Sequence, residues 1–254
     1  MTEDSKQRYF VWLSYDGTSY HGWQAQPGAV SVQGELEKAL SVLLRRTVEV
    51  TGAGRTDSGV HARVMAAHFD WCGPLPAPVA TPSALVYKLN CVLPADIAVS
   101  RVEAVAPDMH ARFSARARTY HYYIHARKDP FLRAHSLELM HTHYDFGAMN
   151  AAAALLLQYD DFASFCKTGS DNKTTLCHVS EARWVDDGDG RWHFVITADR
   201  FLRNMVRAIV GTLLRVGRGA LTVDGFRRVI ERHDRQAAAD SAPAHALFLH
   251  DIRY

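Results

Sequence analysis

The sequence predicts an α+β protein made of two ferredoxin-like halves, each with the element order β-α-β-β-α-β. Two observations predict this class. Apolar runs with the period of strands alternate with runs in which apolar residues recur every three or four positions, as on one face of a helix. The same order of elements then occurs a second time, and the halves meet near residues 105–115 of the 254-residue chain.

The first half is predicted over residues 1–107. Ser31 precedes Val32, Leu36 and Leu40, which share one helical face, and a serine hydroxyl suits a helix N-cap. The predicted elements are a strand at 9–17, a helix at 31–44, strands at 47–53 and 64–71, a helix at 83–90 and a strand at 96–105.

The second half is predicted over residues 108–254. The turn "DDGDG" separates two of its strands. The predicted elements are a strand at 117–126, a helix at 145–159, strands at 175–185 and 191–199, a helix at 201–217, an extra helix at 222–233 and a strand at 246–254. Either two sheets pack together or one continuous sheet crosses both halves.

Composition excludes few classes of protein. Lys and Arg number 29 and Asp and Glu 27, so any basic surface must come from local clustering. The four cysteines form no CxxC pair and are predicted to be reduced thiols of a cytoplasmic protein. The polar N-terminus predicts no signal peptide, and the longest apolar run, 151–157, is too short for a membrane span.

Histidines and cysteines offer two weak candidates for metal binding. These are "HTH" at 141–143 and the neighbouring pair Cys177 and His178. Neither has the spacing typical of a zinc site. Ordinary polar residues of loop and strand are the favoured interpretation, so no metal site is predicted.

The loop "GAGRTDSGVHA" at 52–62 is the strongest candidate for chemistry. Asp57 lies two residues after Arg55, and in an extended segment both side chains point to one side. A nearby guanidinium favours the charged form of a carboxyl group. An ionised aspartate there can act as a nucleophile, a base or a partner for a developing cation. The alternative is a structural Asx-turn before Gly59.

Two basic segments favour a nucleic-acid substrate. In the strand at 116–123, Arg116, Arg118, Tyr120 and Tyr122 fall on one face. Guanidinium groups suit phosphates, and aromatic rings suit unstacked bases of RNA. In the helix from 201, one side is lined by the basic residues Arg200, Arg203 and Arg207. Ordinary tyrosine packing and a solvated basic face are the alternatives.

The chain resembles the tRNA pseudouridine synthase A family through motifs that follow one another in the family's order. The motif "GRTDSGVHA" is the most specific of them. The matching segments are "YDGTSYHGWQAQ" (15–26), "SVQGELEKAL" (31–40), "GAGRTDSGVHA" (52–62), "LNCVLPADI" (89–97), "HARFSARARTYHYYI" (110–124), "DFASF" (161–165) and "FLRNMVRAIVGTLLRVGRG" (201–219).

The resemblance implies one mixed, mostly antiparallel sheet with helices on one side and a central RNA-binding cleft. It implies that Asp57 is catalytic, that Tyr120 stacks on the target base and that Arg55 lies beside the aspartate. Arg207 matches the arginine that pairs with the aspartate, and Leu247 the leucine at the uracil. The implied substrate is uridine 38, 39 or 40 of tRNA, bound by a homodimer. Arg116, Arg118 and Arg203 are expected to contact the RNA backbone.

The sequence departs from the family pattern at two places. It has "ALFL" at 246–249 where the family has Gly-Leu-Tyr-Leu, and Val64-Met65 where the family has Gly-Gln. The first departure bears on the assignment of Leu247. Neither touches Asp57, Tyr120 or Arg207.

The implied reaction is an isomerisation, so no cofactor is expected. The N1–C1′ bond breaks, uracil rotates, and C5 bonds to C1′. Asp57 can attack C1′ or remove the C2′ proton to give a glycal, and the sequence leaves both routes open. Two other functions also stay open. An RNA-binding module has no need of Asp57, and a nucleoside hydrolase releases free uracil.

Overall fold

The computed structural model describes residues 6–139, 143–169 and 173–254, and the chain divides into two compact units. Unit 1 comprises residues up to Arg116 together with Leu249–Tyr254, and unit 2 comprises Ala117–Phe248. The boundary at 107/108 stays a prediction for the two halves. No helix in the described part of the chain has the length and hydrophobicity that crossing a membrane requires.

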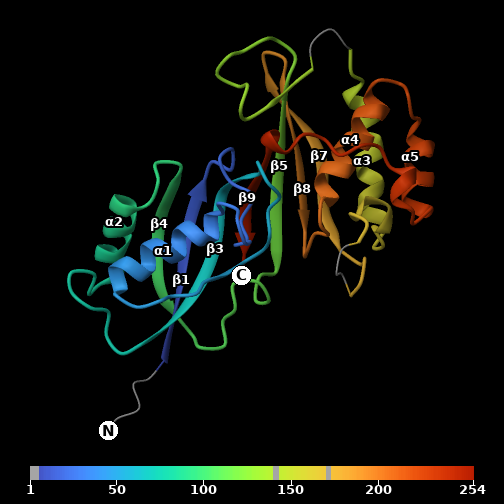
Figure 1. Ribbon diagram of the computed structural model, residues 1–254. Coiled ribbons are helices and arrows are strands. Elements are labelled where there is room, and N and C mark those ends of the chain that lie inside the picture. The colour runs from blue at the N-terminus through green and yellow to red at the C-terminus, as the bar shows by residue number, and fades with distance from the viewer. Residues whose placement is uncertain (1–5, 140–142, 170–172) are drawn as a thin grey trace. The chain divides into compact units, whose positions relative to one another are not determined.

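Unit 1 has two helices on one face of an antiparallel set of strands (Figure 1). Its strands follow the order β4-β1-β3-β9, with β2 beside β3. The elements are β1 (Lys6–Tyr15), α1 (Val32–Leu44), β2 (Thr51–Gly52), β3 (His61–Cys72), α2 (Pro82–Val92), β4 (Ile97–Val105) and most of β9 (Leu247–Arg253).

Helix α1 forms where the apolar spacing predicts it. Ser31 is its N-cap, and the Ser31 hydroxyl accepts a hydrogen bond from the amide of Gly34. Leu36 and Leu40 are fully buried, as is Val11 of β1. These side chains form the core between the helices and the sheet of unit 1.

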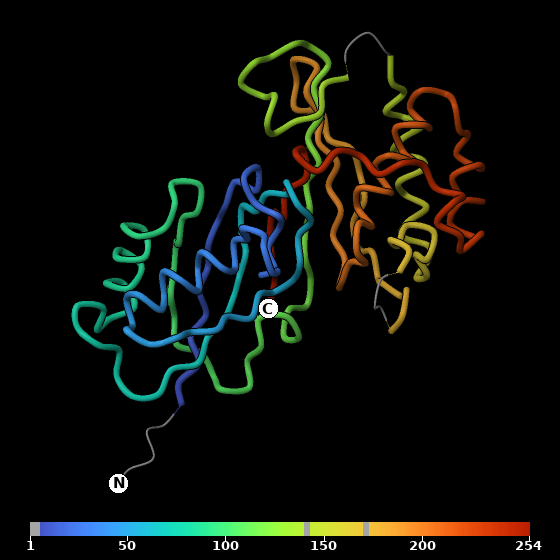
Figure 2. Tube along the Cα trace, in the orientation of Figure 1, coloured from blue at the N-terminus to red at the C-terminus, as the bar shows by residue number. Residues whose placement is uncertain are grey.

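Unit 2 places its helices to one side of the strands β5-β8-β7, as the chain trace shows (Figure 2). These strands are antiparallel, while β6 pairs with β5 in parallel. The elements are β5 (Ala117–His125), β6 (Leu137–Glu138), α3 (Phe146–Leu155), β7 (Val179–Gly188), β8 (Arg191–Ala198), α4 (Met205–Gly217) and α5 (Val223–Glu231). Short 3₁₀ turns lie at Leu156–Gln158, Ala163–Phe165, Arg235–Ala237 and Ala244–Ala246.

The predicted α+β class with mixed, mostly antiparallel strands is confirmed. One predicted strand is much shorter than expected, because the strand predicted at 47–53 is reduced to Thr51–Gly52. Side chains of α1 satisfy the backbone in its place. Ser41 accepts a hydrogen bond from the amide of Val48, and Glu37 accepts one from the amide of Val50. With these amides occupied, the segment does not need a strand partner.

The helix-free face of unit 1 holds a buried histidine that must be neutral in the folded protein. His68 of β3 stacks on Phe10, with 6.1 Å between ring centroids, and its Nδ1 accepts a hydrogen bond from the amide of Ala111. Burial, followed by the positive charge of Arg8, lowers the pKa of His68 to about 4. Protonation of His68 therefore opposes folding.

This buried histidine predicts a loss of stability in mild acid. The unfolded chain takes up a proton on His68 below about pH 6.5, whereas the folded chain does so only near pH 4. The free energy of unfolding is then fully retained above pH 6.5 and falls by about 3 kcal/mol towards pH 4. Urea unfolding across this pH range measures the slope. His68→Gln is expected to remove most of it, and equal slopes in both proteins would contradict the assignment.

Candidate active site

Asp57 lies on the loop 55–60 between β2 and β3, and it is half-buried. The loop is fixed to a second loop of unit 1 through Tyr20. The amide of Gly59 donates to the carbonyl of Tyr20 at 3.3 Å, and the hydroxyl of Ser58 donates to the same carbonyl at 3.2 Å. The two residues that follow Asp57 are thus held against the second loop.

The second loop comes close enough only because it carries glycine at two positions. A Cβ atom on Gly17 would lie 2.0 Å from the carbonyl oxygen of Val60. A Cβ atom on Gly22 would lie 2.2 Å from the carbonyl oxygen of Thr56, and Gly22 also has a φ of +85°. The glycine-rich segment after β1 and the loop of Asp57 therefore pack backbone against backbone.

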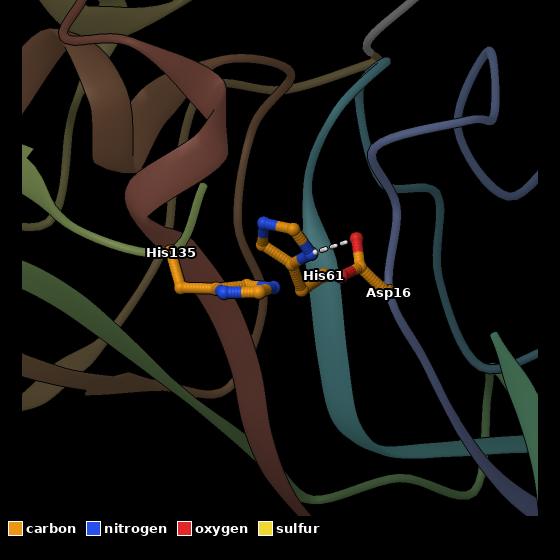
Figure 3. Close-up of side chains that lie close together, drawn as sticks. All are labelled: Asp16, His61 and His135. Carbon is orange, nitrogen blue, oxygen red and sulfur yellow. Dashed lines mark ion pairs between the residues drawn. The ribbon is translucent and has the colours of Figure 1, made fainter. Parts of the chain in front are cut away.

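A buried histidine ties both loops to the sheet. His61, at the start of β3, is only 1% exposed. Its Nδ1 lies 2.9 Å from the amide nitrogen of Gly17 and 3.1 Å from a carboxylate oxygen of Asp16 (Figure 3). His61 belongs to the sequence motif "GVHA" but was not among the predicted site residues. Its contacts identify it as a positioning residue for the two loops.

Tyr20 anchors the second loop from its other side. Its ring is buried, and its hydroxyl donates a hydrogen bond of 2.5 Å to Asp96. Burial, and then this hydrogen bond, raise the pKa of the Tyr20 hydroxyl. Tyr20 therefore stays protonated and keeps its bond to Asp96 at neutral pH. Arg55, in contrast, is exposed to solvent at the start of the loop of Asp57.

In unit 2, Tyr120 and Tyr122 lie on the same face of β5 but in different surroundings. Opposite them on β8 are Ile196 and Phe194. Tyr120 is 9% exposed, and its ring meets that of Phe201 edge to face with 5.0 Å between centroids. Tyr122 is fully buried, and its hydroxyl donates to the carbonyl of Pro243 at 3.0 Å. Tyr122 is a core residue.

Replacing Tyr122 by alanine is expected to destabilise unit 2. The change removes a fully buried ring and leaves the carbonyl of Pro243 without its donor. A cavity of this kind costs about 3–5 kcal/mol. Thermal or urea unfolding gives the free energy directly. Tyr122→Phe keeps the ring and is the matched control, with an expected loss of about 1 kcal/mol for the hydrogen bond. Wild-type stability in Tyr122→Ala would contradict the core assignment.

Arg207 lies in the first turn of α4. Its Nε donates to the carbonyl of Ala242 at 2.7 Å, and the amide of Ala242 donates back to the carbonyl of Arg207 at 2.9 Å. This double contact fixes the start of α4 to the segment before β9. The guanidinium group of Arg207 is therefore held in a fixed position.

The predicted helix from Phe201 begins later than expected, at Met205. Asn204 precedes it in the left-handed region, with a φ of 65°. Arg203 is therefore not on the helix, and neither is Arg200, so they do not share a helical face with Arg207. Arg203 is exposed, and Arg200 donates to the carbonyls of a neighbouring loop.

The remaining predicted residues lie near the ends of strands. Arg116 is exposed just before β5, and Arg118 donates to the carbonyl of Asp199 at 2.9 Å. Leu247 is buried at the start of β9. Asp57, Arg55 and Arg116 belong to unit 1, and unit 2 contains the other predicted site residues, which are Arg118, Tyr120, Arg203, Arg207 and Leu247.

The cysteines are free thiols, and one of them is buried. Burial raises the pKa of the Cys177 thiol to about 12, so this side chain is protonated at neutral pH. The other candidate for metal binding was "HTH" at 141–143, and its residues 141 and 142 lie outside the described part of the chain.

Comparison with known proteins gives matches over nearly the whole chain. The family model described as tRNA pseudouridine synthase matches residues 12–114 and 152–254. A tRNA pseudouridine synthase A of Bacteroides thetaiotaomicron is 56% identical, over 98% of this chain and 91% of the relative. Proteins of the same name from Parabacteroides distasonis and Chlorobaculum tepidum are 52% and 41% identical, each over 98% of this chain and at least 96% of the relative.

These matches define the chain as an enzyme of the pseudouridine synthase class, which are isomerases. Within that class, the chain belongs to the tRNA pseudouridine synthase family. The family that the sequence motifs indicated is confirmed, and so is the predicted class of enzyme.

Proposed function

We propose that this protein converts uridine to pseudouridine at positions 38, 39 and 40 in the anticodon stem-loop of tRNA. The observation that carries the proposal is the loop "GRTDSGVHA". Its Asp57 is half-buried on a backbone held by hydrogen bonds from Gly59 and Ser58 to Tyr20. Such a loop keeps one carboxylate in place while a nucleotide moves past it.

The chemistry needs one carboxylate and no redox step. The N1–C1′ bond breaks, and cationic character develops at C1′ as in glycoside hydrolysis. Asp57 stabilises that charge either by bonding to C1′ or by taking the C2′ proton to give a glycal. Uracil then turns and C5 bonds to C1′, while the bond between Asp57 and C1′ breaks on the first route or the C2′ proton returns on the second. The proton on C5 then leaves, and N1 gains one. Atoms and electrons balance within the nucleotide, so no co-reactant is required.

Each side chain of the proposed site has a separate task. Arg207 orients the Asp57 carboxylate by a charge-assisted hydrogen bond in the complex with RNA. Tyr120 stacks on the uracil and keeps it from leaving, and Leu247 supplies an apolar surface beside it. The fixed base of Arg207 on Ala242 supports this role, because an orienting group must itself be rigid.

The RNA backbone is proposed to meet arginines outside this centre. Arg116 and Arg203 are exposed, whereas Arg55, exposed beside Asp57, is proposed to bind the substrate nucleotide itself. Arg118 is held by the carbonyl of Asp199 and still presents further N–H groups. We further propose a homodimer that binds one tRNA across both subunits. The four free thiols support the cytoplasm as its location.

One experiment tests the function. An unmodified tRNA transcript with uridines at 38–40 is incubated with the protein, and pseudouridine is mapped by carbodiimide-blocked primer extension. Stops at these positions and no release of free uracil are expected. Release of uracil would identify a nucleoside hydrolase. Tight binding with no modification would identify an RNA-binding module.

A further inference from the structure

The segment after β5 presents a phenylalanine to solvent on a well-ordered turn. We call residues 127–135 the Phe131 turn. Phe131 is 90% exposed, the highest value among the large apolar side chains of the described residues. Figure 1 shows this segment as a loop that extends past the upper end of β5, beside the turn between β7 and β8. Burying such a ring is favourable, so its complete exposure needs an explanation.

The exposure of Phe131 is not a consequence of a loose loop. Asp129 accepts a hydrogen bond from the amide of Phe131 at 2.8 Å through its carboxylate, and one from the amide of Leu132 at 3.2 Å through its carbonyl. Pro130 precedes the ring and restricts the backbone further. The turn therefore holds the ring outwards in a defined orientation.

Both ends of the turn are also attached to the sheet of unit 2. At its start, the amide of Ala126 donates to the carbonyl of Gly190 at 2.9 Å. At its end, Ser136 and the Nδ1 of His125 are hydrogen-bonded at 2.9 Å, and β6 then pairs with β5. A phenylalanine on a turn that is attached at both ends loses little conformational entropy when a partner binds it.

Three cations lie within four residues of Phe131 in the sequence. Arg127 and Lys128 precede it, Arg133 follows it, and all three are exposed. None of them forms an ion pair with a carboxylate in the part of the chain that the structure describes. Asp129 is the one acidic residue of the turn, and its carboxylate accepts from the backbone. The turn is thus strongly basic around an aromatic centre.

We propose that the Phe131 turn is a second RNA-binding site, at which Phe131 stacks on an unstacked base of the tRNA while Arg127, Lys128 and Arg133 contact the adjoining phosphates. An aromatic ring between cations matches the pattern by which proteins hold single-stranded nucleic acid. A second copy of the chain is a poorer occupant, because two such turns would bring like charges together. The inference rests on the proposed function, since it takes tRNA as the partner.

The site is separate from the proposed catalytic centre but within reach of the same RNA. Arg127 follows Tyr120 by seven residues, most of them on strand β5. At about 3.3 Å per residue, the turn begins roughly 20 Å from Tyr120 along the strand. The base at Phe131 is therefore a different nucleotide from the target uridine. Its binding raises affinity for tRNA and leaves the chemical step unchanged.

The test compares Phe131→Ser with Phe131→Tyr, using an unmodified full-length tRNA transcript. Phe131→Ser is expected to raise Kd and KM about tenfold, equivalent to about 1.4 kcal/mol, with kcat within about twofold of wild type. Phe131→Tyr keeps the ring and should retain wild-type values. Tyr87→Ser is the matched control, because Tyr87 on α2 is also an exposed aromatic residue, 66% exposed, with Lys88 nearby, and it lies outside the segments proposed to bind RNA. It should leave both constants unchanged.

Charge removal provides an independent measurement. Replacing Arg127, Lys128 and Arg133 together by glutamine should flatten the slope of log Kd against log salt by about two, at roughly 0.7 for each lost phosphate contact. Unchanged Kd and slope in these variants would overturn the proposal. A lower oligomeric state of Phe131→Ser in sedimentation, with unchanged Kd, would assign the turn to self-association. A wild-type chain that binds the transcript without modifying it overturns the proposed function alone, because the Kd comparison still tests the turn.

Discussion

Replacing Asp57 by asparagine is expected to reduce pseudouridine formation at least a thousandfold, which corresponds to about 4 kcal/mol of transition-state stabilisation. The amide has the shape of the carboxylate but can neither bond to C1′ nor accept the C2′ proton. The loop around it is held by backbone groups of Gly59 and Tyr20, so the fold should not change. Single-turnover kinetics on an unmodified tRNA transcript measure the loss.

The same variant separates catalysis from binding. Affinity of Asp57→Asn for tRNA should stay within about tenfold of wild type, because most of the RNA contacts are made elsewhere. Asp108→Asn is the control, since Asp108 is an exposed carboxylate of the same unit and its loss should leave activity intact. More than a tenth of wild-type activity in Asp57→Asn would remove Asp57 from the mechanism.

The elements with strong periodicity could be predicted from the sequence, and their ends depended on local hydrogen bonds. Helix α1 begins after Ser31 as predicted, because the N-cap serine and the amide that it caps are close neighbours in the sequence. The strand expected at 47–53 is reduced to Thr51–Gly52 because Ser41 and Glu37, on the preceding helix, accept hydrogen bonds from the amides of Val48 and Val50. A pattern of apolar residues contains no information about such partners.

Helix α4 shows the same limit at its start. The apolar spacing of "FLRNMVRAIVG" continues through Phe201, but Asn204 turns into the left-handed region and the helix begins at Met205. Arg203 consequently leaves the basic face that it was expected to share with Arg207. Asparagine tolerates that region better than most residues, so its presence was the available clue.

The site was predicted as separate motifs, and the structure explains why two of them occur together. Gly17 and Gly22 lie in the segment "YDGTSYHGWQAQ", and each makes room for a carbonyl of the loop of Asp57. His61 joins the two segments at the start of β3. The only sign of such a backbone contact in a sequence is a glycine, which does not say what it contacts. The pairing of these two loops therefore could not be predicted from the spacing of residues.

The second large effect is expected at Tyr120, whose ring is proposed to hold the detached uracil. Tyr120→Ala should lower turnover by about a hundredfold, within the 1–3 kcal/mol that base–aromatic stacking contributes. Affinity for tRNA should fall much less, because many contacts hold the tRNA and one ring holds the base. The loss therefore belongs in kcat, since the ring acts after the N1–C1′ bond has broken.

The register of β5 decides how the Tyr120 result is interpreted. Tyr120→Phe keeps the ring against Phe201 and should retain RNA binding, although loss of the hydroxyl is expected to slow removal of the C5 proton. Tyr122→Phe, on the same strand face, should be fully active, because the Tyr122 ring lies in the core and its hydroxyl donates to the carbonyl of Pro243. Steady-state rates and melting curves of the three variants provide the comparison. An active Tyr120→Ala beside a stable but inactive Tyr122→Ala, measured in the same way, would mean that the base-stacking residue is assigned two positions too early on the strand.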